Sequence, residues 1–266
     1  MNLIQITDKE YQKFVGLIFN EIGITLNEHK KSLVESRLFK RILHHNVDSF
    51  NTYYDICIQD NREKMEMLNL ITTNETYFFR ESEHFDFLKN YLMEYQSSTK
   101  VRIWSAAASV GAEAYSIAMT CNTLLASNMW EVLGSDINDQ VIKKARMGLY
   151  PLTWADKIAP ELRHKYCLKG KGKYEGEFLI DRQLAKNVRF MNNNLLDANI
   201  SFGHFNIVFL RNVLIYFNDE TRERVINNIT HNMQSGSYLI ISQTENLNSL
   251  HVPQLEQVRA SIYKVK

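Results

Sequence analysis

The segment from Val101 to Asp136 constrains the fold of this chain more than any other. An apolar, strand-like run from Val101 to Trp104 precedes a patch of small residues that ends at Gly111, and a helical pattern then leads to a second strand-like run ending in Asp136. Small side chains after a first strand let the backbone approach a ligand closely, and an acid ending the second strand can accept the hydroxyls of a ribose. This order of features is typical of a nucleotide-type cofactor site.

Strand-like and helical patterns alternate through the remainder of the chain. The predicted strands span 101–104, 130–135, 188–191, 205–210, 238–242 and 258–265, and the predicted helices span 112–125, 138–147 and 219–233. Such alternation predicts an α/β fold, in which helices cover both faces of a parallel sheet and ligands sit at the carboxyl ends of its strands. The alternation lapses over 151–187, which contains two prolines and the basic run KGKGKYEGEF. We interpret this stretch as an inserted flap.

The first seventy residues show helical patterning throughout. Thr7 followed by Glu10 suggests the start of a helix, and Gly23 suggests its end. Apolar residues at helical spacing form two stripes, namely Tyr11, Phe14, Ile18 and Ile22, and then Val34, Leu38 and Ile42. We therefore expect a helical domain over residues 1–72, a linker over 73–98 that contributes to the cofactor site, and an α/β domain over 99–266.

Composition argues against several classes of function. The formal net charge of +1 gives no reason to expect nucleic acid as a partner, and no apolar run approaches the roughly 18 residues needed to cross a bilayer. The start of the chain does not resemble a signal peptide, so we expect a cytoplasmic protein without membrane insertion. The three cysteines are widely spaced and the eight histidines lack metal-ligand spacing, so no metal is implied.

Four strings in the sequence carry a resemblance to a known family. They are TTNETYFFRE at 72–81, WSAAASVGAEAYSIAM at 104–119, GSDIND at 134–139 and FNIVFLRNVLIYF at 205–217. They resemble the chemotaxis receptor methyltransferases, the CheR family, and the likeness extends over nearly the whole chain. The resemblance implies a Rossmann-like S-adenosylmethionine-dependent methyltransferase domain, with a small all-helical N-terminal domain for substrate recognition and an inserted β flap.

The same resemblance implies an activity and its partners. Members transfer a methyl group from S-adenosyl-L-methionine to glutamate side chains in the cytoplasmic helical domain of chemoreceptors, leaving S-adenosyl-L-homocysteine. A glutamate, whose ordinary pKa is about 4.3, is already ionised at neutral pH, so this reaction needs no general base. Alignment of the reactants alone can supply roughly 7–11 kcal/mol. The lack of a Ser/His/Asp or paired-carboxylate motif is therefore expected.

Two acids are expected to contact the cofactor. By resemblance Asp136 binds its ribose, although it would also be an ordinary cap for a helix beginning near Asn138. Glu113 matches the second acid of the family's glycine-glutamate-glutamate stretch, although an acid in the first turn of a helix is also favoured by the helix dipole.

The string around Arg80 supplies three further candidates. Asn74 and Thr76 resemble the family's polar cofactor contacts, and Arg80 resembles an arginine placed beside the transferring methyl group. A guanidinium can hold a carboxylate through two parallel hydrogen bonds, which suits a glutamate substrate or the amino-acid tail of the cofactor, so Arg80 is expected to bind the cofactor as well. The alternative for Arg80 is a surface arginine paired with Glu83 or His84.

Two later strand ends complete the expected cofactor site. By resemblance Asn194 and Leu195 contact the adenine region, Asn212 and Val213 line the cofactor, and Tyr216 faces the methyl group with Arg80. Asparagine is also a common turn residue, and strand-end packing is the alternative for the other positions.

Two surfaces are expected to meet the receptor. Arg37, Lys40 and Arg41 share one helix face, which by resemblance binds an acidic receptor helix, although such a face is usually just solvated. The flap resembles that of relatives that pair with a tethering peptide at the receptor C-terminus by strand addition, and its glycines would permit close backbone approach. A flexible surface loop is the alternative for the flap.

Departures from the family pattern leave a second function open. Val110, Ala112 and Ala114 stand where the family usually has threonine, glutamate and proline. The alternative function is therefore a non-catalytic cofactor-binding sensor or adaptor of the same fold. A third possibility, methylation of a small molecule or nucleic acid, is opposed by the near-neutral charge and by the absence of an Asn- or Asp-Pro-Pro-aromatic sequence.

Overall fold

A computed structural model describes residues 4–197 and 202–266 of the chain. The chain divides into two compact units, one comprising residues 1–73 with 216–221 and the other comprising 74–215 with 222–266. No helix in the described ranges is long and apolar enough to cross a membrane.

The first unit is helical, as its sequence patterns predict. Thr7 and Glu10 form a reciprocal capping box at the start of its first helix, and Gly23 ends that helix in the left-handed conformation, so both expected boundaries are confirmed. Both predicted apolar stripes are buried. The helices are α1 (Asp8–Ile22), η1 (Glu28–Lys30), α2 (Lys31–His44), α3 (Phe50–Gln59) and α4 (Asn61–Ile71).

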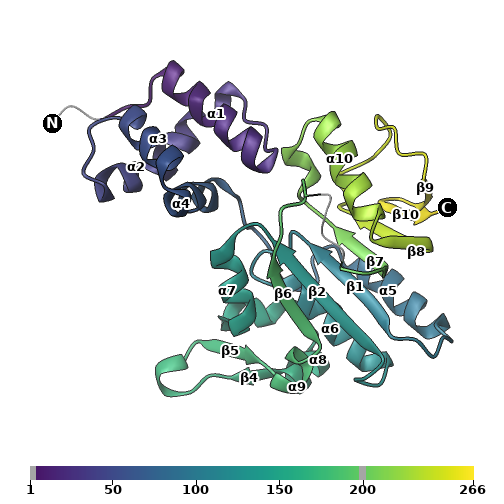
Figure 1. Cartoon of the computed structure of the whole chain (residues 1–266). Helices are drawn as coiled ribbons and strands as arrows, with labels where there is room; N and C mark the ends of the chain where they lie inside the picture. The colour runs from purple at the N-terminus through teal and green to yellow at the C-terminus, as the bar shows by residue number, and fades with distance from the viewer. Residues whose placement is uncertain (1–3, 198–201) are drawn as a thin grey trace. The chain divides into compact units, whose positions relative to one another are not determined.

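The second unit is built on a seven-stranded sheet with the order β6-β2-β1-β7-β8-β10-β9. The first five strands in that order run parallel, and β10 and β9 form an antiparallel pair at the edge. The predicted mostly parallel α/β sheet is thus confirmed (Figure 1). Its strands are β1 (Val101–Ala106), β2 (Trp130–Asp136), β6 (Val188–Asn192), β7 (Phe205–Leu210), β8 (Met233–Ile241), β9 (Leu255–Arg259) and β10 (Ile262–Val265).

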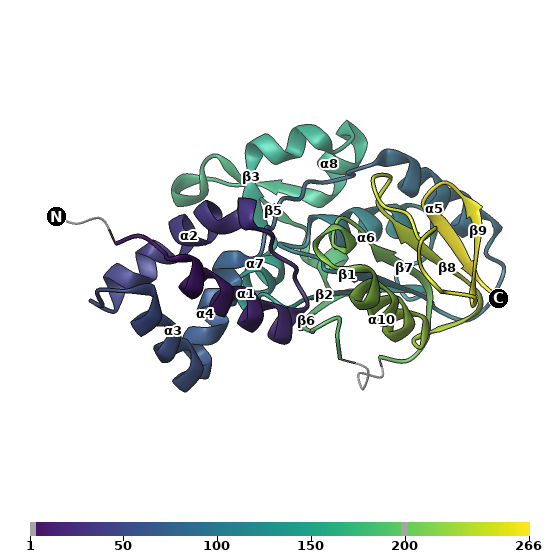
Figure 2. The same cartoon turned by 90° about the horizontal axis from the view of Figure 1, so that it is seen from above.

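Helices cover both faces of this sheet. In Figures 1 and 2, α5 and α6 lie on one face and α10 on the other. The helix α6 is apolar nearly all round, and its residues from Ala114 to Cys121 are buried. The helices are α5 (Ser82–Glu94), α6 (Ala112–Leu124), α7 (Asp139–Met147) and α10 (Asp219–Thr230).

Two predicted boundaries near the C-terminus are wrong. The expected single strand over 258–265 is two strands, β9 and β10, because Ser261 takes a left-handed backbone conformation (φ 60°) that breaks an extended run. The helix expected to reach Met233 ends at Thr230, and Met233 instead begins β8.

The insertion between α7 and β6 forms its own small sheet, which confirms a β flap. Its strands are β3 (Leu149–Pro151), β4 (Cys167–Lys169) and β5 (Glu177–Ile180), in the antiparallel order β3-β5-β4. They alternate with η2 (Leu152–Lys157), α8 (Pro160–Tyr166), η3 (Gly172–Tyr174) and α9 (Arg182–Ala185), and Figure 2 shows β3 and β5 beside α8.

Tyr150 attaches this flap to the rest of the second unit. Its ring contacts Phe78 at 5.0 Å and Phe178 at 5.7 Å between centroids, and its hydroxyl donates to the carbonyl of Val110 at 2.6 Å. The flap is therefore packed against the segment that precedes α6.

Candidate functional site

Asp136 is the last residue of β2 and is only 8% exposed. One carboxylate oxygen accepts the backbone amide of Ser109 and the other accepts that of Asn138, both at 2.9 Å. Burial raises the pKa of Asp136, and the backbone amides of Asn138, Ser109 and Ile137 partly offset this effect. Asn138, rather than Asp136, caps α7, because its side chain accepts the amides of Gln140 and Val141. The carboxylate of Asp136 therefore connects two loops at the carboxyl edge of the sheet.

The loop after β1 is held in an unusual backbone conformation. Ala107 and Ser109 have φ values of 62° and 51°, and Gly111 has a φ of 89°. A β-carbon on Gly111 would lie 2.9 Å from both Ala145 and Phe190, so only glycine fits there. Strained backbone of this kind is concentrated at ligand-binding sites, and it brings amides toward Asp136.

Glu113, in the first turn of α6, is fixed by two partners. Ser105 Oγ donates to one of its carboxylate oxygens at 2.7 Å, and Arg211 Nη1 donates to the other at 2.7 Å. Arg211 follows directly after β7, and its side chain is 2% exposed. No role for Arg211 was predicted from the sequence, where it was recognisable only by its place after a strand-like run, within the string that resembles the family.

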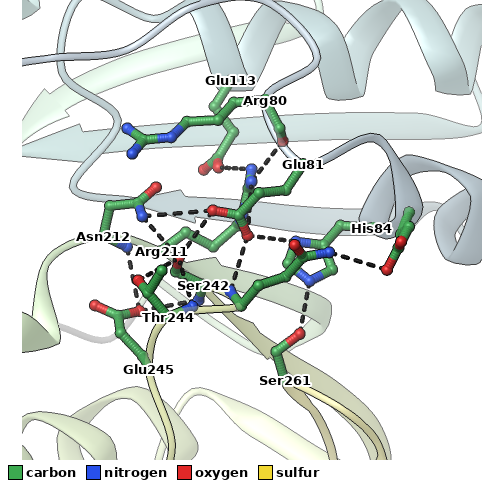
Figure 3. A network of polar contacts seen from close by, with 12 residues as sticks. Arg80, Glu81, His84, Glu113, Arg211, Asn212, Ser242, Thr244, Glu245 and Ser261 are labelled. Atoms are coloured by element: carbon green, nitrogen blue, oxygen red, sulfur yellow. Dashed lines mark hydrogen bonds and ion pairs between the residues drawn. The ribbon is translucent and has the colours of Figure 1, made fainter.

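Arg211 also joins a larger polar network at the ends of β7 and β8 (Figure 3). Its Nη2 donates to the carbonyl of Arg80 at 2.5 Å and lies 3.3 Å from the carboxylate of Glu81. Glu81 also accepts Ser242 Oγ at 2.8 Å and the amide of Gln243 at 3.0 Å. Burial opposes ionisation of Glu81, but the Gln243 amide and the Arg211 guanidinium outweigh it, so the pKa of Glu81 lies below its ordinary value.

Three sequence candidates precede this network. The Nη1 atom of Arg80 donates to the carbonyl of Glu75 at 3.0 Å, and its guanidinium lies 5.6 Å from the centre of the Tyr77 ring. The carbonyl of Asn74 accepts Ser109 Oγ at 3.2 Å, which ties this segment to the loop after β1. Thr76 is half-buried.

The alternative partners proposed for Arg80 are engaged elsewhere. Glu83 accepts Gln243 Nε2 at 2.9 Å, and the ring of His84 contacts Ser261 Oγ at 2.8 Å.

The strand-end candidates after β7 belong to the same network. Asn212 has a φ of 57°, and its Nδ2 donates to Ser242 Oγ at 2.7 Å. The buried carboxylate of Glu245 accepts the amides of Asn212 at 3.2 Å and Ile215 at 3.3 Å. Burial raises the pKa of Glu245 despite these bonds. Sequence reasoning missed Glu245, which organises the turn that carries Asn212.

Val213 and Tyr216 are the other two candidates after β7. Val213 is half-buried, and Tyr216 ends the short helix η4 (Leu214–Tyr216). Tyr216 is grouped with the first unit, where its carbonyl accepts the amide of Thr25 at 2.9 Å.

The segment after β6 supplies two further candidates and one unexpected residue. The side chain of Asn194 accepts the amide of Leu196 at 3.1 Å, and the carbonyl of Leu195 accepts Asn228 Nδ2 at 2.9 Å. Asn193 donates its amide to the carbonyl of Asp136 at 3.0 Å. Its own side-chain oxygen is buried and accepts no hydrogen bond from the part of the chain that the structure describes. A ligand donor beside Asp136 would satisfy this atom.

The predicted basic face lies on α2 in the first unit. Arg37 donates to the carbonyls of Leu70 and Ile71, at the end of α4, at 3.2 and 2.5 Å. Arg41 forms a two-pronged ion pair with the buried Glu63, at 2.8 and 2.5 Å. Lys40 is exposed. Two of the three basic side chains therefore also hold the helical unit together.

Among residues 4–197 and 202–266, no three His, Cys, Asp or Glu side chains are grouped in a way that could hold a metal ion.

Comparison with known proteins gives the class and then the family. Residues 74–263 match the family model described as "CheR methyltransferase, SAM binding domain", and residues 9–72 match "CheR methyltransferase, all-alpha domain". The second unit is therefore an S-adenosylmethionine-binding methyltransferase domain.

Curated relatives cover nearly the whole chain. The chemotaxis protein methyltransferase of Salmonella typhimurium is 34% identical, over 93% of this chain and 87% of that protein. Those of Borreliella burgdorferi and Escherichia coli are each 33% identical, over 98% and 93% of this chain and 95% and 87% of their own lengths. The chain belongs to the CheR family of chemotaxis protein methyltransferases.

The residues at the carboxyl edge of the sheet fit S-adenosylmethionine. Asp136 presents a buried carboxylate at the carboxyl end of β2, and a carboxylate that accepts backbone amides can also accept a ribose hydroxyl. The unpaired oxygen of Asn193 offers a further acceptor beside it. Asp136 and Asn193 would hold the cofactor from the β2 and β6 side, and Glu113 from the first turn of α6.

Proposed function

We propose that this protein methylates glutamate side chains of chemoreceptors in the cytoplasm, giving glutamate methyl esters. Asp136 carries this proposal, because its buried carboxylate connects two loops at the ligand-binding edge of a methyltransferase sheet, and the loop after β1 is strained. Glu113, Asn74, Thr76, Asn194, Leu195, Asn212 and Val213 complete the proposed cofactor site. Arg80 and Tyr216 are proposed to shape the transfer site, and Arg80 is proposed to contact the cofactor as well.

The choice of a carboxylate acceptor rests on charge. When bound, S-adenosylmethionine supplies an activated methyl group, and an ionised glutamate needs no base to accept it. Arg80 offers a guanidinium that can orient such a carboxylate through two parallel hydrogen bonds. His84, four residues after Arg80, is buried against Ser261 and has its pKa lowered to about 4 by burial and by the charge of Arg211, so it is a weak base. The side chains around Arg80 thus favour an anionic acceptor over one that must lose a proton.

Radiolabelled methyl transfer to receptor-containing membranes tests this function. Base-labile label in the receptor band, absent after substitution of the receptor's candidate glutamates by alanine, is the expected result. Calorimetric cofactor binding without any label would favour the sensor or adaptor instead. Label found only in RNA or metabolites would contradict a protein substrate.

The three residues that depart from the family pattern, Val110, Ala112 and Ala114, lie in the hydrophobic core or pack against it. Ala112 and Ala114 are fully buried in α6, and the carbonyl of Val110 accepts the hydroxyl of Tyr150. Glu113 retains its contacts with Ser105 and Arg211. These contacts support catalysis over the adaptor.

The face of α2 is the proposed receptor contact. Of Arg37, Lys40 and Arg41, only Lys40 is exposed. Substituting Lys40 therefore tests docking without breaking the contacts that Arg37 and Arg41 make inside the helical unit. Because charge complementarity mainly accelerates encounter, Lys40→Glu should raise the KM for receptor several-fold and leave kcat nearly unchanged. Lys9→Glu, on the exposed surface of α1, is the matched control. Equal KM values for the two variants would remove α2 as the contact.

The flap is the proposed site for a receptor C-terminal tethering peptide. Its strand β4 is an edge strand, with Leu168 exposed, and edge strands accept added strands. A pocket of about 530 Å³ adjoins β4, and Arg163 and Lys169 outnumber Asp156 in its lining. An acidic peptide with an apolar anchor fits this chemistry. Deleting the receptor's terminal residues should slow methylation strongly, and unchanged rates would rule out the tether.

A further inference from the structure

The backbone around Arg80 is strained on both sides. Phe79 and Glu81 have φ values of 54° and 56°, and neither is glycine. Such a backbone conformation is strained and persists only where surrounding contacts fix it. On one side, the amide of Phe79 donates to Ser116 Oγ at 3.0 Å. On the other side, the fixing contacts come from Glu81.

The carboxylate of Glu81 is bound from three directions. Ser242 Oγ and the amide of Gln243 attach it to the end of β8, at 2.8 and 3.0 Å, and Arg211 Nη2 approaches it to 3.3 Å. Its side chain is 14% exposed. A carboxylate with this many donors has little freedom to rotate, so Glu81 anchors the start of α5 to the ends of two strands.

Arg211 closes the arrangement around the Arg80 peptide. The same Nη2 atom that approaches Glu81 donates to the carbonyl of Arg80 at 2.5 Å. In Figure 3 this carbonyl faces Arg211, whereas the Arg80 guanidinium points away from the network. The network therefore fixes the main chain of Arg80 and leaves its charged group outside.

We propose that Glu81 is a positioning residue for methyl transfer, which fixes the Arg80 backbone through Arg211 and the end of β8 and so keeps the Arg80 guanidinium at the transfer site. This inference rests on the proposed role of Arg80. Positioning matters at this level because a displacement of about 1 Å at a reacting centre can reduce a rate by roughly 100-fold.

The substitution Glu81→Gln keeps the size of the side chain and removes its charge. We expect kcat to fall by about ten-fold or more, and the dissociation constant for S-adenosylmethionine to rise by a smaller factor. Glu83→Gln is the matched control, because Glu83 lies two residues on, is exposed and contacts only the side chain of Gln243 within this network. A Glu81→Gln enzyme with the kcat of Glu83→Gln would overturn the proposal.

A double-mutant cycle separates positioning from general structural damage. If Glu81 acts through Arg80, then Glu81→Gln should lower kcat no further in an Arg80→Ala background. A loss as large in that background as in the wild type would overturn the proposal. Such additivity would mean that Glu81 acts independently of Arg80.

A spectroscopic measurement tests the same inference without any activity. The Nε–Hε resonance of Arg80 in a ¹⁵N spectrum, assigned by its loss in Arg80→Lys, should shift or broaden in Glu81→Gln and remain in place in Glu83→Gln. An unchanged resonance in Glu81→Gln would contradict the proposal. If the wild-type protein binds cofactor but methylates no receptor, the proposed function fails while this spectrum still decides the role of Glu81.

Discussion

The carboxylate of Asp136 at the end of β2 accepts the backbone amide of Ser109, in the turn after β1, at 2.9 Å. Because β1 and β2 are parallel neighbours, their carboxyl ends meet at one edge, and this bond joins the two loops there. A short acidic side chain thus sets the shape of the cofactor loop as well as offering acceptors to a ligand.

Replacing Asp136 by asparagine should weaken cofactor binding. The change removes the charge and turns one acceptor into a donor that faces a backbone amide. Hydrogen bonds to a charged group contribute about 1.5–3 kcal/mol, so we expect the dissociation constant for S-adenosylmethionine to rise by about 10- to 100-fold in calorimetry. Asp139→Asn is the control, because Asp139 is exposed and contacts Asn192. Equal affinities for the two variants would contradict the role of Asp136.

Local patterns were enough to predict most elements and several of their ends. Thr7 and Gly23 cap the two ends of α1, and residues close by in the sequence are enough to predict both caps. Asp136 ends a strand whose apolar pattern is clear. By contrast, the turn between β9 and β10 uses Ser261 at positive φ, where glycine or asparagine would have been the recognisable signal. The sequence pattern therefore merged two strands into one.

The polar network could not be predicted, because its partners are far apart in the chain. Arg211 pairs with Glu113 across 98 residues and with the Arg80 carbonyl across 131. The contacts of the basic residues on α2 could not be predicted either. Helical spacing correctly placed Arg37 and Arg41 on one face, but their partners on α4 depend on how the helices pack.

Glu63 should contribute strongly to the stability of the helical unit. Burial opposes its ionisation, but hydrogen bonds from Arg41 and from the hydroxyl of Tyr53 outweigh this and lower the pKa of Glu63 to about 2. The shift corresponds to about 3 kcal/mol, so Glu63→Gln should destabilise the unit by roughly that amount at pH 7. Far-UV circular dichroism during urea unfolding measures the change.

The stabilisation by Glu63 should depend on pH. Glu63 has a folded-state pKa below its ordinary value, so its contribution is complete above about pH 4.5 and is lost as the pH falls toward about 2. The difference between wild type and Glu63→Gln should shrink over that range. Asp55→Asn, an exposed acid on α3, should behave as wild type. A constant difference down to pH 2 would contradict the role of this ion pair.

Gly111→Ala should impair both folding and cofactor binding. A left-handed backbone strains any residue with a β-carbon by about 1–2 kcal/mol, and the new atom would also lie 2.9 Å from Ala145 and Phe190. We expect a loss of at least about 2 kcal/mol in unfolding free energy, together with weaker cofactor binding, because Ser109 and its amide precede this position. Gly16→Ala is the control, since nothing lies within 4 Å of an added β-carbon there. Equal stability of the two variants would contradict this account.

His84 should make the methyltransferase domain sensitive to mild acid. The side chain is 2% exposed, and burial together with the positive charge of Arg211 lowers its pKa from 6.5 to about 4. As the pH falls from about 6.5 to about 4, the unfolded state binds a proton that the folded state refuses, so the unfolding free energy should decrease by about 3 kcal/mol. Below about pH 4 the folded state is protonated too, and the loss should level off.

Tryptophan fluorescence during urea unfolding isolates this effect, because Trp104, Trp130 and Trp154 all lie in the second unit. Other groups titrate over the same range, so the comparison that matters is between variants. His84→Gln should lose about 3 kcal/mol less than the wild type between pH 6.5 and pH 4, while His29→Gln, exposed in the helical unit, should retain the full dependence. If the unfolding free energies of wild type and His84→Gln change in parallel with pH, then His84 takes up its proton as readily in the folded state as in the unfolded state. That result would contradict a lowered pKa for His84.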